Sequence, residues 1–305
     1  RNFANKIWNA SRFVMMNLTI DKCELPTADK LAPEDKWVLS KLNTLVKEVT
    51  ENLDAYEIGV ASAKVYDFIW DTYCDWYIEL TKTRLNGEDE AAKLVAQNVL
   101  CYVLTELLKL LHPFMPFITE EIFQALPHEG NFIMTSQWPE YQDSLSFPAE
   151  ETAMEAVMDT IKAIRARRAE MNVPPSKKAE VLLVTATPEI YQQGLHFIQR
   201  LAYASQVTFA DAAPADVSKQ VSVVTHNATA YMPMAELVDM AAELDRINKE
   251  LEKARNGLRI VEQKLSNEKF VSKAPESVVN AEKEKAAKYN ELIAKLEESA
   301  KAMQA

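Results

Sequence analysis

Side chains suited to gripping unpaired nucleic-acid bases gather in the first helix-like stretch of the chain. Aromatic rings stack on bases, and amides and guanidinium groups hydrogen-bond to base edges. Residues 1–12 carry both kinds on the side opposite an apolar stripe formed by Phe3, Ile7 and Val14. The face consists of Arg1, Asn5, Trp8, Asn9 and Arg12. It predicts an RNA-binding surface, and the alternative is a solvated helix that half-buries one indole.

A second aromatic cluster lies between residues 68 and 84 and permits the same two interpretations. An aromatic stripe at helical spacing forms part of a core more often than a stacking platform, so we expect Phe68 and Tyr73 to be buried. Trp76, Tyr77 and Lys82 are the candidate RNA contacts of this stretch.

Basic residues recur at two further places. In the middle of the chain, Lys162, Arg165 and Arg168 are candidate phosphate contacts, with plain solubility as the alternative. Further on, residues 246–273 hold eight basic and four acidic residues, a local excess of +4 in a chain of net charge -11. A basic tip on an acidic body favours the binding of a single polyanion in one position. The alternative interpretation of these residues is an ordinary coiled coil whose charged faces are solvated. The candidates there are Lys249, Lys253, Arg255, Arg259, Lys264, Lys269, Phe270 and Lys273.

Catalytic chemistry is not indicated by the sequence. The five glycines stand singly, so no glycine-rich loop can cradle a phosphate. The four histidines lie far apart without metal-ligand spacing, and no nucleophile motif such as G-x-S-x-G occurs. The three cysteines include no C-x-x-C pair, which disfavours a disulfide framework and a zinc knuckle. We therefore expect no catalytic residue, no metal site and no cofactor in these residues.

Composition indicates a mainly helical protein of two or three domains. Of the 305 residues, 48% are hydrophobic, which is enough to form hydrophobic cores, and 26% are charged. No apolar run of 18 residues and no signal peptide stand out, so we expect a soluble, cytoplasmic protein without a membrane partner. The sequence opens on Arg1 inside a helical pattern, and we expect it to be a part of a longer protein.

The pattern of elements divides the chain into three regions. Residues 1–146 are typical of a bundle of amphipathic helices, one of them running from Glu57 to about Leu85. Residues 147–233 combine a long helix with short β-branched runs, which predicts a small α+β module. In residues 234–305 apolar residues repeat every three and four positions, break at Pro275 and resume, which predicts an antiparallel coiled-coil hairpin. The second half of this seam meets Glu282 towards the turn, so we expect looser pairing there.

Two stretches carry a family resemblance. Residues 1–13, RNFANKIWNASRF, resemble the helix that opens the anticodon-binding domain of the class I valyl, isoleucyl and leucyl tRNA synthetases. Residues 111–121, LHPFMPFITEE, are similar to another of their signatures, a proline-rich turn into a helix. The choice among the three families comes from the C-terminal hairpin, which has residues 267–275, NEKFVSKAP, at its turn and resembles the valyl family. Isoleucyl enzymes typically end in a cysteine-rich zinc module instead, and leucyl enzymes end in a small α/β domain.

The resemblance implies a mainly α fold with a helical anticodon-binding domain, a small α+β module and a coiled-coil arm. It implies that a monomeric chain binds tRNA(Val), with the bundle reading the anticodon and the arm touching the tRNA body. The family's two ATP-site signatures, His-x-Gly-His and Lys-Met-Ser-Lys-Ser, are missing here. We therefore expect ATP and Mg to act in the parent valine–tRNA ligase, outside these residues. The alternatives are the same region of an isoleucyl or leucyl enzyme, and a coiled-coil adaptor that binds protein helices.

Overall fold

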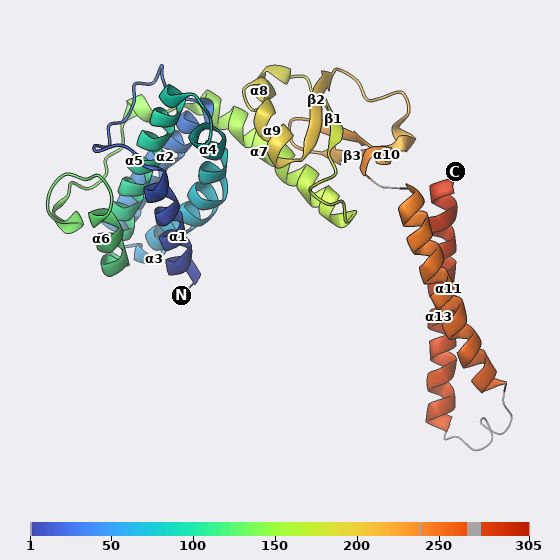
Figure 1. The fold of residues 1–305 in the computed structure, drawn as a ribbon. Coiled ribbons are helices and arrows are strands. Elements are labelled where there is room, and N and C mark those ends of the chain that lie inside the picture. The colour runs from blue at the N-terminus through green and yellow to red at the C-terminus, as the bar shows by residue number, and fades with distance from the viewer. Residues whose placement is uncertain (1, 238–239, 267–275, 305) are drawn as a thin grey trace.

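The computed structural model describes residues 2–237, 240–266 and 276–304. Figure 1 shows a helical bundle and a small α/β module lying side by side, with a two-helix arm projecting away from them. The predicted fold class is confirmed, since helices dominate and the only sheet within the described residues has four strands.

The bundle buries one apolar stripe from each of its helices. Its elements are α1 (Asn2–Asn17), α2 (Pro33–Asp54), α3 (Ile58–Asp67), the π-helical segment η1 (Phe68–Tyr77), α4 (Ile78–Leu85), α5 (Glu90–Leu111) and α6 (Pro116–Gln124). Local chemistry sets the helix starts. Pro33 occupies the first turn of α2, and the carboxylate of Asp89 accepts the backbone N–H groups of Ala91 and Ala92 at the start of α5.

α5 is the central helix of the bundle and packs against α1, α2, α3, α4 and α6. Among the described residues it is the one helix long and apolar enough to cross a membrane by length and composition. Two-thirds of its most apolar window, 67%, is buried inside the protein. These protein contacts account for its apolar composition, because a helix at the centre of a bundle is hydrophobic nearly all round.

The helix predicted from Glu57 to Leu85 is continuous, but its middle is not α-helical. Ten residues, Phe68–Tyr77, follow the wider π-helical path between α3 and α4. Phe68 and Tyr73 are buried there as predicted, with exposures of 7% and 1%. π-Helical turns occur frequently at functional sites, because they shift the directions in which side chains point.

A long helix, α7 (Pro148–Glu170), joins the bundle to the α/β module. Its first half packs on α2, where Glu150 accepts from Lys36 Nζ at 3.0 Å and Glu155 accepts from Lys41 Nζ at 2.9 Å. Its later turns pack on α8 and α9 of the module. The loop before it includes the short 3-10 turns η2 (Ile133–Thr135) and η3 (Asp143–Leu145).

The module is a mixed four-stranded sheet in the order β2-β1-β4-β3. β1 and β2 run parallel, whereas β4 is antiparallel to both β1 and β3. Its elements are β1 (Ala179–Val184), α8 (Pro188–Gln192), α9 (Leu195–Leu201), β2 (Ala204–Ala210), η4 (Val217–Lys219), β3 (Gln220–Val224), β4 (Thr229–Pro233) and α10 (Met234–Leu237). Leu237, the first residue of the predicted heptad seam, is 2% exposed, and its helix α10 contacts β1 and β4.

The arm consists of α11 (Met240–Leu265) and α13 (Glu276–Gln304), which lie side by side (Figure 1). Leu251, Ala254 and Val261 are buried at the predicted seam positions of α11. On α13 the seam continues to Glu282 and Val279, both less than 9% exposed. The expected loosening at Glu282 is therefore wrong. Its carboxylate lies at the seam 2.9 Å from Lys285 Nζ and 3.7 Å from Lys264 Nζ, which compensate the buried charge.

Candidate nucleic-acid interface

The outer face of α1 presents the polar and aromatic residues that its sequence pattern predicts. Asn5, Asn9 and Arg12 are exposed, and Trp8 is 39% exposed, whereas Ile7 is 1% exposed on the opposite side. Arg1, the remaining candidate of this face, lies outside the described residues. The geometry leaves two amides, an indole and a guanidinium available to a ligand, and their role as RNA contacts stays a prediction.

An aromatic ladder lies beside this face and was not predicted. The Phe3 and Tyr66 rings are 4.6 Å apart between centroids, and Tyr66 stacks on Trp70 at 5.7 Å. The ammonium of Lys6 sits 3.9 Å from the centre of the Trp70 ring and 2.7 Å from the carboxylate of Asp75. The sequence pattern places Phe3 in the buried stripe, yet it is only half-buried. The available signal was the four-residue spacing of Tyr66 and Trp70, which places two aromatic rings on one helix face.

The candidates of η1 and α7 meet although they are far apart in the sequence, while the candidate of α4 lies against α1. Lys162 Nζ lies 5.4 Å from the centre of the Trp76 ring, and Lys82 Nζ lies 5.7 Å from that of Phe13. Lys82 also pairs with Glu79. Arg165 is exposed one turn further along α7. The structure thus brings Trp76 and Lys162 together, whereas Lys82 lies beside Phe13 and Glu79.

Two predicted contacts are wrong because their side chains are buried. Tyr77 is 0% exposed, and its hydroxyl donates to Asp35 Oδ1 at 2.7 Å inside the bundle. Arg168 is 3% exposed, and its guanidinium donates to the backbone oxygens of Pro174 and Lys177. A guanidinium donates hydrogen bonds to backbone carbonyls at a helix end as readily as it donates them to phosphates. Arg168 therefore stabilises the turn after α7.

A buried ion-pair network holds the helices behind this surface. Arg84 Nη1 donates to Asp35 Oδ2 at 2.7 Å, and Arg84 Nε lies 2.9 Å from Glu34 Oε1. Burial lowers the pKa of Arg84, but its hydrogen bonds with Asp35 together with the nearby charges of Asp35 and Glu34 outweigh this and raise the pKa overall. Burial raises the pKa of Glu34 to about 7, against the opposing charge of Arg84. From the module, Arg200 donates to the backbone oxygen of Glu79, just past the π-helical segment.

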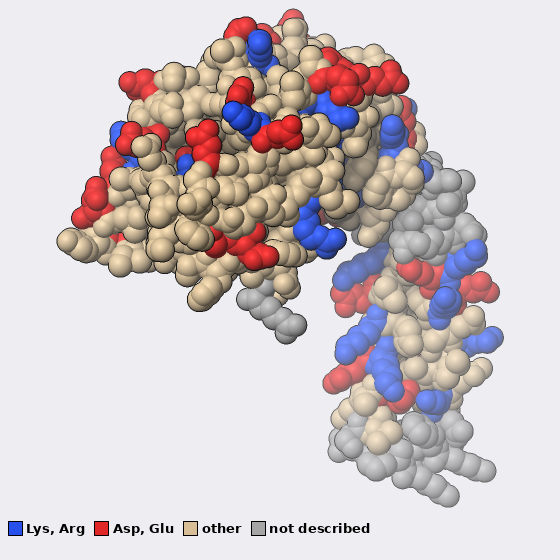
Figure 2. Space-filling model, turned by 60° about the vertical axis from the view of Figure 1, so that its left-hand side comes forward, with Lys and Arg blue, Asp and Glu red and all other residues tan. Residues whose placement is uncertain are grey.

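The arm exposes its cations among acidic neighbours. Figure 2 shows Lys and Arg interleaved with Asp and Glu along the arm, and acidic groups scattered over the body. Arg255 pairs with Glu297 across the hairpin at 2.6 Å, and both side chains remain more than half exposed. Lys253 and Arg259 are exposed and make no ion pair within the described residues. Lys249 is also exposed, and Lys264 pairs with Glu282, while Lys269, Phe270 and Lys273 lie outside the described residues.

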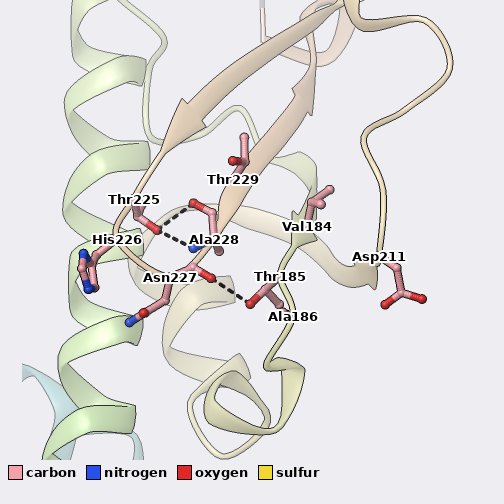
Figure 3. Close-up of a pocket in the computed structure, with 9 residues that line it drawn as sticks. All are labelled: Val184, Thr185, Ala186, Asp211, Thr225, His226, Asn227, Ala228 and Thr229. Atoms are coloured by element: carbon pink, nitrogen blue, oxygen red, sulfur yellow. Dashed lines mark hydrogen bonds between the residues drawn. The ribbon is translucent and has the colours of Figure 1, made fainter.

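The loops at one end of the sheet enclose an open hollow of about 450 Å3 (Figure 3). Two of its threonines hydrogen-bond to backbone oxygens of the same loop. Thr185 Oγ1 donates to Asn227 O at 2.8 Å, and Thr225 Oγ1 donates to Ala228 O at 2.9 Å. Across residues 2–237, 240–266 and 276–304, no group of three or more His, Cys, Asp or Glu side chains is arranged to hold a metal ion. The two threonine hydrogen bonds stabilise the turn that lines the hollow. The aromatic and cationic surface is the candidate site.

Two family models match the chain. One, described as the anticodon-binding domain of tRNA ligase, matches residues 35–183. The other, described as the valyl tRNA synthetase tRNA binding arm, matches residues 239–304. The first covers most of the bundle together with α7 and β1, and the second covers the arm.

Curated relatives match along nearly the whole chain. A valine–tRNA ligase of Clostridium acetobutylicum is 48% identical over 98% of this chain and 34% of its own length. That of Carboxydothermus hydrogenoformans is 44% identical over 93% of this chain and 32% of its own length. That of Staphylococcus carnosus is 42% identical over 95% of this chain and 34% of its own length. The chain thus spans about a third of the length of these relatives.

A helical bundle followed by a two-helix arm, matched by these two models, defines a nucleic-acid-binding region of the tRNA ligase class. The alternative of an isoleucyl or leucyl enzyme is set aside, because the arm model and the relatives are valine-specific by description. The chain belongs to the valyl-tRNA synthetase family and corresponds to its C-terminal region.

Proposed function

We propose that the chain binds tRNA(Val) as a monomer, with the bundle at the anticodon and the arm on the tRNA body. In the complete enzyme this grip would serve the ATP-dependent attachment of valine. ATP and Mg would be handled outside these residues, since the sequence contains neither ATP-site signature of the family. The observation that carries this proposal is the exposed row of Asn5, Trp8, Asn9 and Arg12 on α1. This helix packs on η1 and α5, which lie inside residues 35–183, the part that matches the anticodon-binding family.

The chemistry of the surface supports this proposal. Unpaired anticodon bases expose their flat faces and edges, and the surface offers an indole for stacking and amides and a guanidinium for edges. Trp76 and Lys162 extend it across the junction with α7, where a phosphate of the anticodon stem can meet the ammonium group. The buried ion pair of Arg84 and Asp35 keeps the supporting helices in place.

Substitution on α1 tests the assignment. Trp8→Ala and Arg12→Ala should each weaken binding of tRNA(Val) by about 1–3 kcal/mol, roughly 5- to 150-fold, because each removes one stacking or base-edge contact. Arg12→Lys keeps the positive charge but loses the bidentate fork. It should behave like Arg12→Ala if Arg12 reads a base, and like the wild type if it meets a phosphate.

A matched control comes from an exposed aromatic residue elsewhere. Tyr56 is 88% exposed at the turn between α2 and α3 and has a φ of 60°, which asparagine tolerates. Tyr56→Asn should leave tRNA affinity unchanged. A tRNA of another specificity that carries the valine anticodon should bind more tightly than its parent. If Trp8→Ala and Arg12→Ala both bind like the wild type, the anticodon is read elsewhere on the bundle.

A further inference from the structure

The outer side of α3 is apolar although it lies at the protein surface. On the inner side, Ala61 and Val65 are buried against the bundle. On the outer side, Val60, Ala63 and Tyr66 are exposed. A helix that is hydrophobic all round normally lies inside a protein, and an exposed apolar patch of this kind marks a surface that contacts another macromolecule.

This apolar surface continues from α3 onto the first turn of α1. The ring of Tyr66 lies 4.6 Å from that of Phe3 and stacks on that of Trp70, so the row joins two helices into one surface. Lys6 covers the Trp70 ring at 3.9 Å, which leaves little of that ring free for a stacking base. We call this surface the α3 face and define it by Phe3, Val60, Ala63, Tyr66 and Trp70.

Acidic residues surround the α3 face. Residues 56–75 contain acids at positions 57, 67, 71 and 75, all exposed, and a single basic residue, Lys64, which pairs with Glu48 at 2.7 Å. The phosphates of RNA are repelled by such a stretch. A two-fold contact between copies of this chain would place the same acids against one another. The charge therefore favours a different protein surface, one whose apolar centre is flanked by Lys or Arg.

The position of the α3 face indicates which surface meets it. Figure 1 shows the start of α1 next to α3, and the contact of Phe3 with Tyr66 places the first turn of α1 within the face. The chain matches 34% of the length of a relative and corresponds to the C-terminal region of the family. In such a longer enzyme the preceding polypeptide reaches the bundle at the α3 face.

We propose that the α3 face is the surface on which the preceding part of the synthetase packs, through an apolar patch flanked by cations. The contact fixes the orientation of the bundle relative to that part, because α3 is held on its inner side by α2 and α5. It uses none of the α1 residues assigned to tRNA, so it stands independently of the proposed tRNA binding.

Cysteine labelling tests the proposal by comparing the 305-residue chain with the complete synthetase. Ala63→Cys places a thiol on the α3 face, and mass spectrometry follows its alkylation by iodoacetamide separately from that of the native cysteines. We expect rapid labelling in the 305-residue chain. In the complete synthetase labelling should be at least about tenfold slower, because only local opening of the contact admits the reagent.

A second cysteine position is the matched control for reagent access. Ala91 is exposed in the first turn of α5, shortly after α4 ends. Since α3, η1 and α4 form one continuous helix, this position lies at the opposite end of that helix from α3. Ala91→Cys should be labelled at the same rate in both proteins.

A charge placed in the α3 face should undo the protection. Val60 is 46% exposed, so Val60→Asp should shift the Tm of the 305-residue chain by no more than about 2 °C. In the complete synthetase it buries an unpaired carboxylate in the contact, and labelling of Ala63→Cys should return to within about threefold of the rate in the 305-residue chain. Leu94→Asp is the matched control, because Leu94 is 50% exposed on α5, and it should leave that labelling slow.

The proposal is overturned if Ala63→Cys is labelled at the same rate in both proteins, or if Ala91→Cys is protected to the same extent in the complete synthetase. Slower labelling of the 305-residue chain at higher protein concentration would assign the α3 face to a second copy of the chain. Slower labelling after addition of tRNA would assign it to RNA. Either result also overturns the proposal.

Discussion

The bundle and the arm handle their charges in opposite ways. In the bundle, Arg84 and Asp35 are paired in the interior, where the Asp35 side chain is 0% exposed. In the arm, Arg255 and Glu297 pair across the hairpin with 62% and 51% of their side chains exposed. Buried pairs fix shape because an uncompensated charge in the interior is costly, while exposed pairs are weak and exchange readily with other partners. The Arg84–Asp35 pair is therefore structural, whereas the exposed pair of Arg255 and Glu297 can open and leave the guanidinium to a polyanion.

Removing one guanidinium from each region should separate the two cases most sharply. Arg84→Ala leaves two buried carboxylates without their partner and should lower the free energy of unfolding by about 3–5 kcal/mol. Arg255→Ala, the matched change in the arm, should cost about 0–1 kcal/mol. Chemical denaturation followed by circular dichroism measures both. Equal costs for the two variants would refute the contrast between structural and available charge.

Deleting the arm should change binding in a salt-dependent manner. The cut belongs after Leu237, because that side chain is buried and its helix α10 contacts β1 and β4. Without residues 238–305, different tRNAs should bind more weakly by similar factors. The slope of log affinity against log salt should flatten by roughly 0.7–0.9 for each phosphate that the arm neutralises in the intact chain. Filter binding at several salt concentrations, with tRNA(Val) and a tRNA of another specificity, provides the measurement.

Charge reversal within the intact arm is the control for that deletion. Lys253→Glu with Arg259→Glu alters two exposed cations that make no ion pair within the described residues, and it should flatten the slope without removing the hairpin. An unchanged slope after deletion would mean that the arm does not meet RNA, and a protein-binding adaptor would then be the better interpretation of the arm. A weakening confined to tRNA(Val) would show that the arm reads identity.

How far the sequence predicts this molecule depends on the range of the interaction. Heptad spacing alone predicts the arm, since Leu251, Ala254 and Val261 are buried where the pattern places them. The π-helical segment cannot be predicted from the sequence, because the aromatic residues at 66, 70, 73 and 77 fit an α-helical stripe equally well. Local periodicity fixes which face of a helix is apolar, but it does not fix the partner of that face.

The errors at the candidate site have the same origin. Tyr77 and Arg168 have the right chemistry for RNA, but their partners Asp35 and Lys177 take up that chemistry inside the protein. Asp35 is 42 residues from Tyr77, and no spacing rule reaches that far. The same holds for Cys23 and Asn98, which are 75 residues apart and whose contact depends on how one loop crosses α5. Exposed residues on a single helix, such as Asn9 and Arg12, were predictable because helical periodicity alone decides their exposure.

A pH measurement sharpens the account of the buried network. Folding raises the pKa of Glu34 from the ordinary 4.5 to about 7 through burial, so the folded protein binds this proton more tightly than the unfolded chain. The stabilising contribution of this group is complete below about pH 4.5 and is lost as the pH rises through about 7. Glu34→Gln mimics the protonated form at every pH. The Tm of the variant minus that of the wild type should be several degrees more positive at pH 8 than at pH 5. An equal difference at both pH values would show that Glu34 is ionised throughout.

The smallest expected effect concerns one close approach inside the arm. Gly257 on α11 faces the ring of Tyr289 on α13, and an added Cβ would lie 2.6 Å from Cζ of that ring. Alanine favours a helix over glycine by about 1 kcal/mol, whereas the added Cβ forces the ring aside at a similar cost. Gly257→Ala should therefore leave the arm's stability within about 1 kcal/mol of the wild type. In a Tyr289→Ala background the clash is absent, and Gly257→Ala should stabilise by about 1 kcal/mol. Thermal unfolding of the four proteins completes this double-mutant cycle, and equal effects of Gly257→Ala in both backgrounds would mean that the ring does not occupy the space beside Gly257.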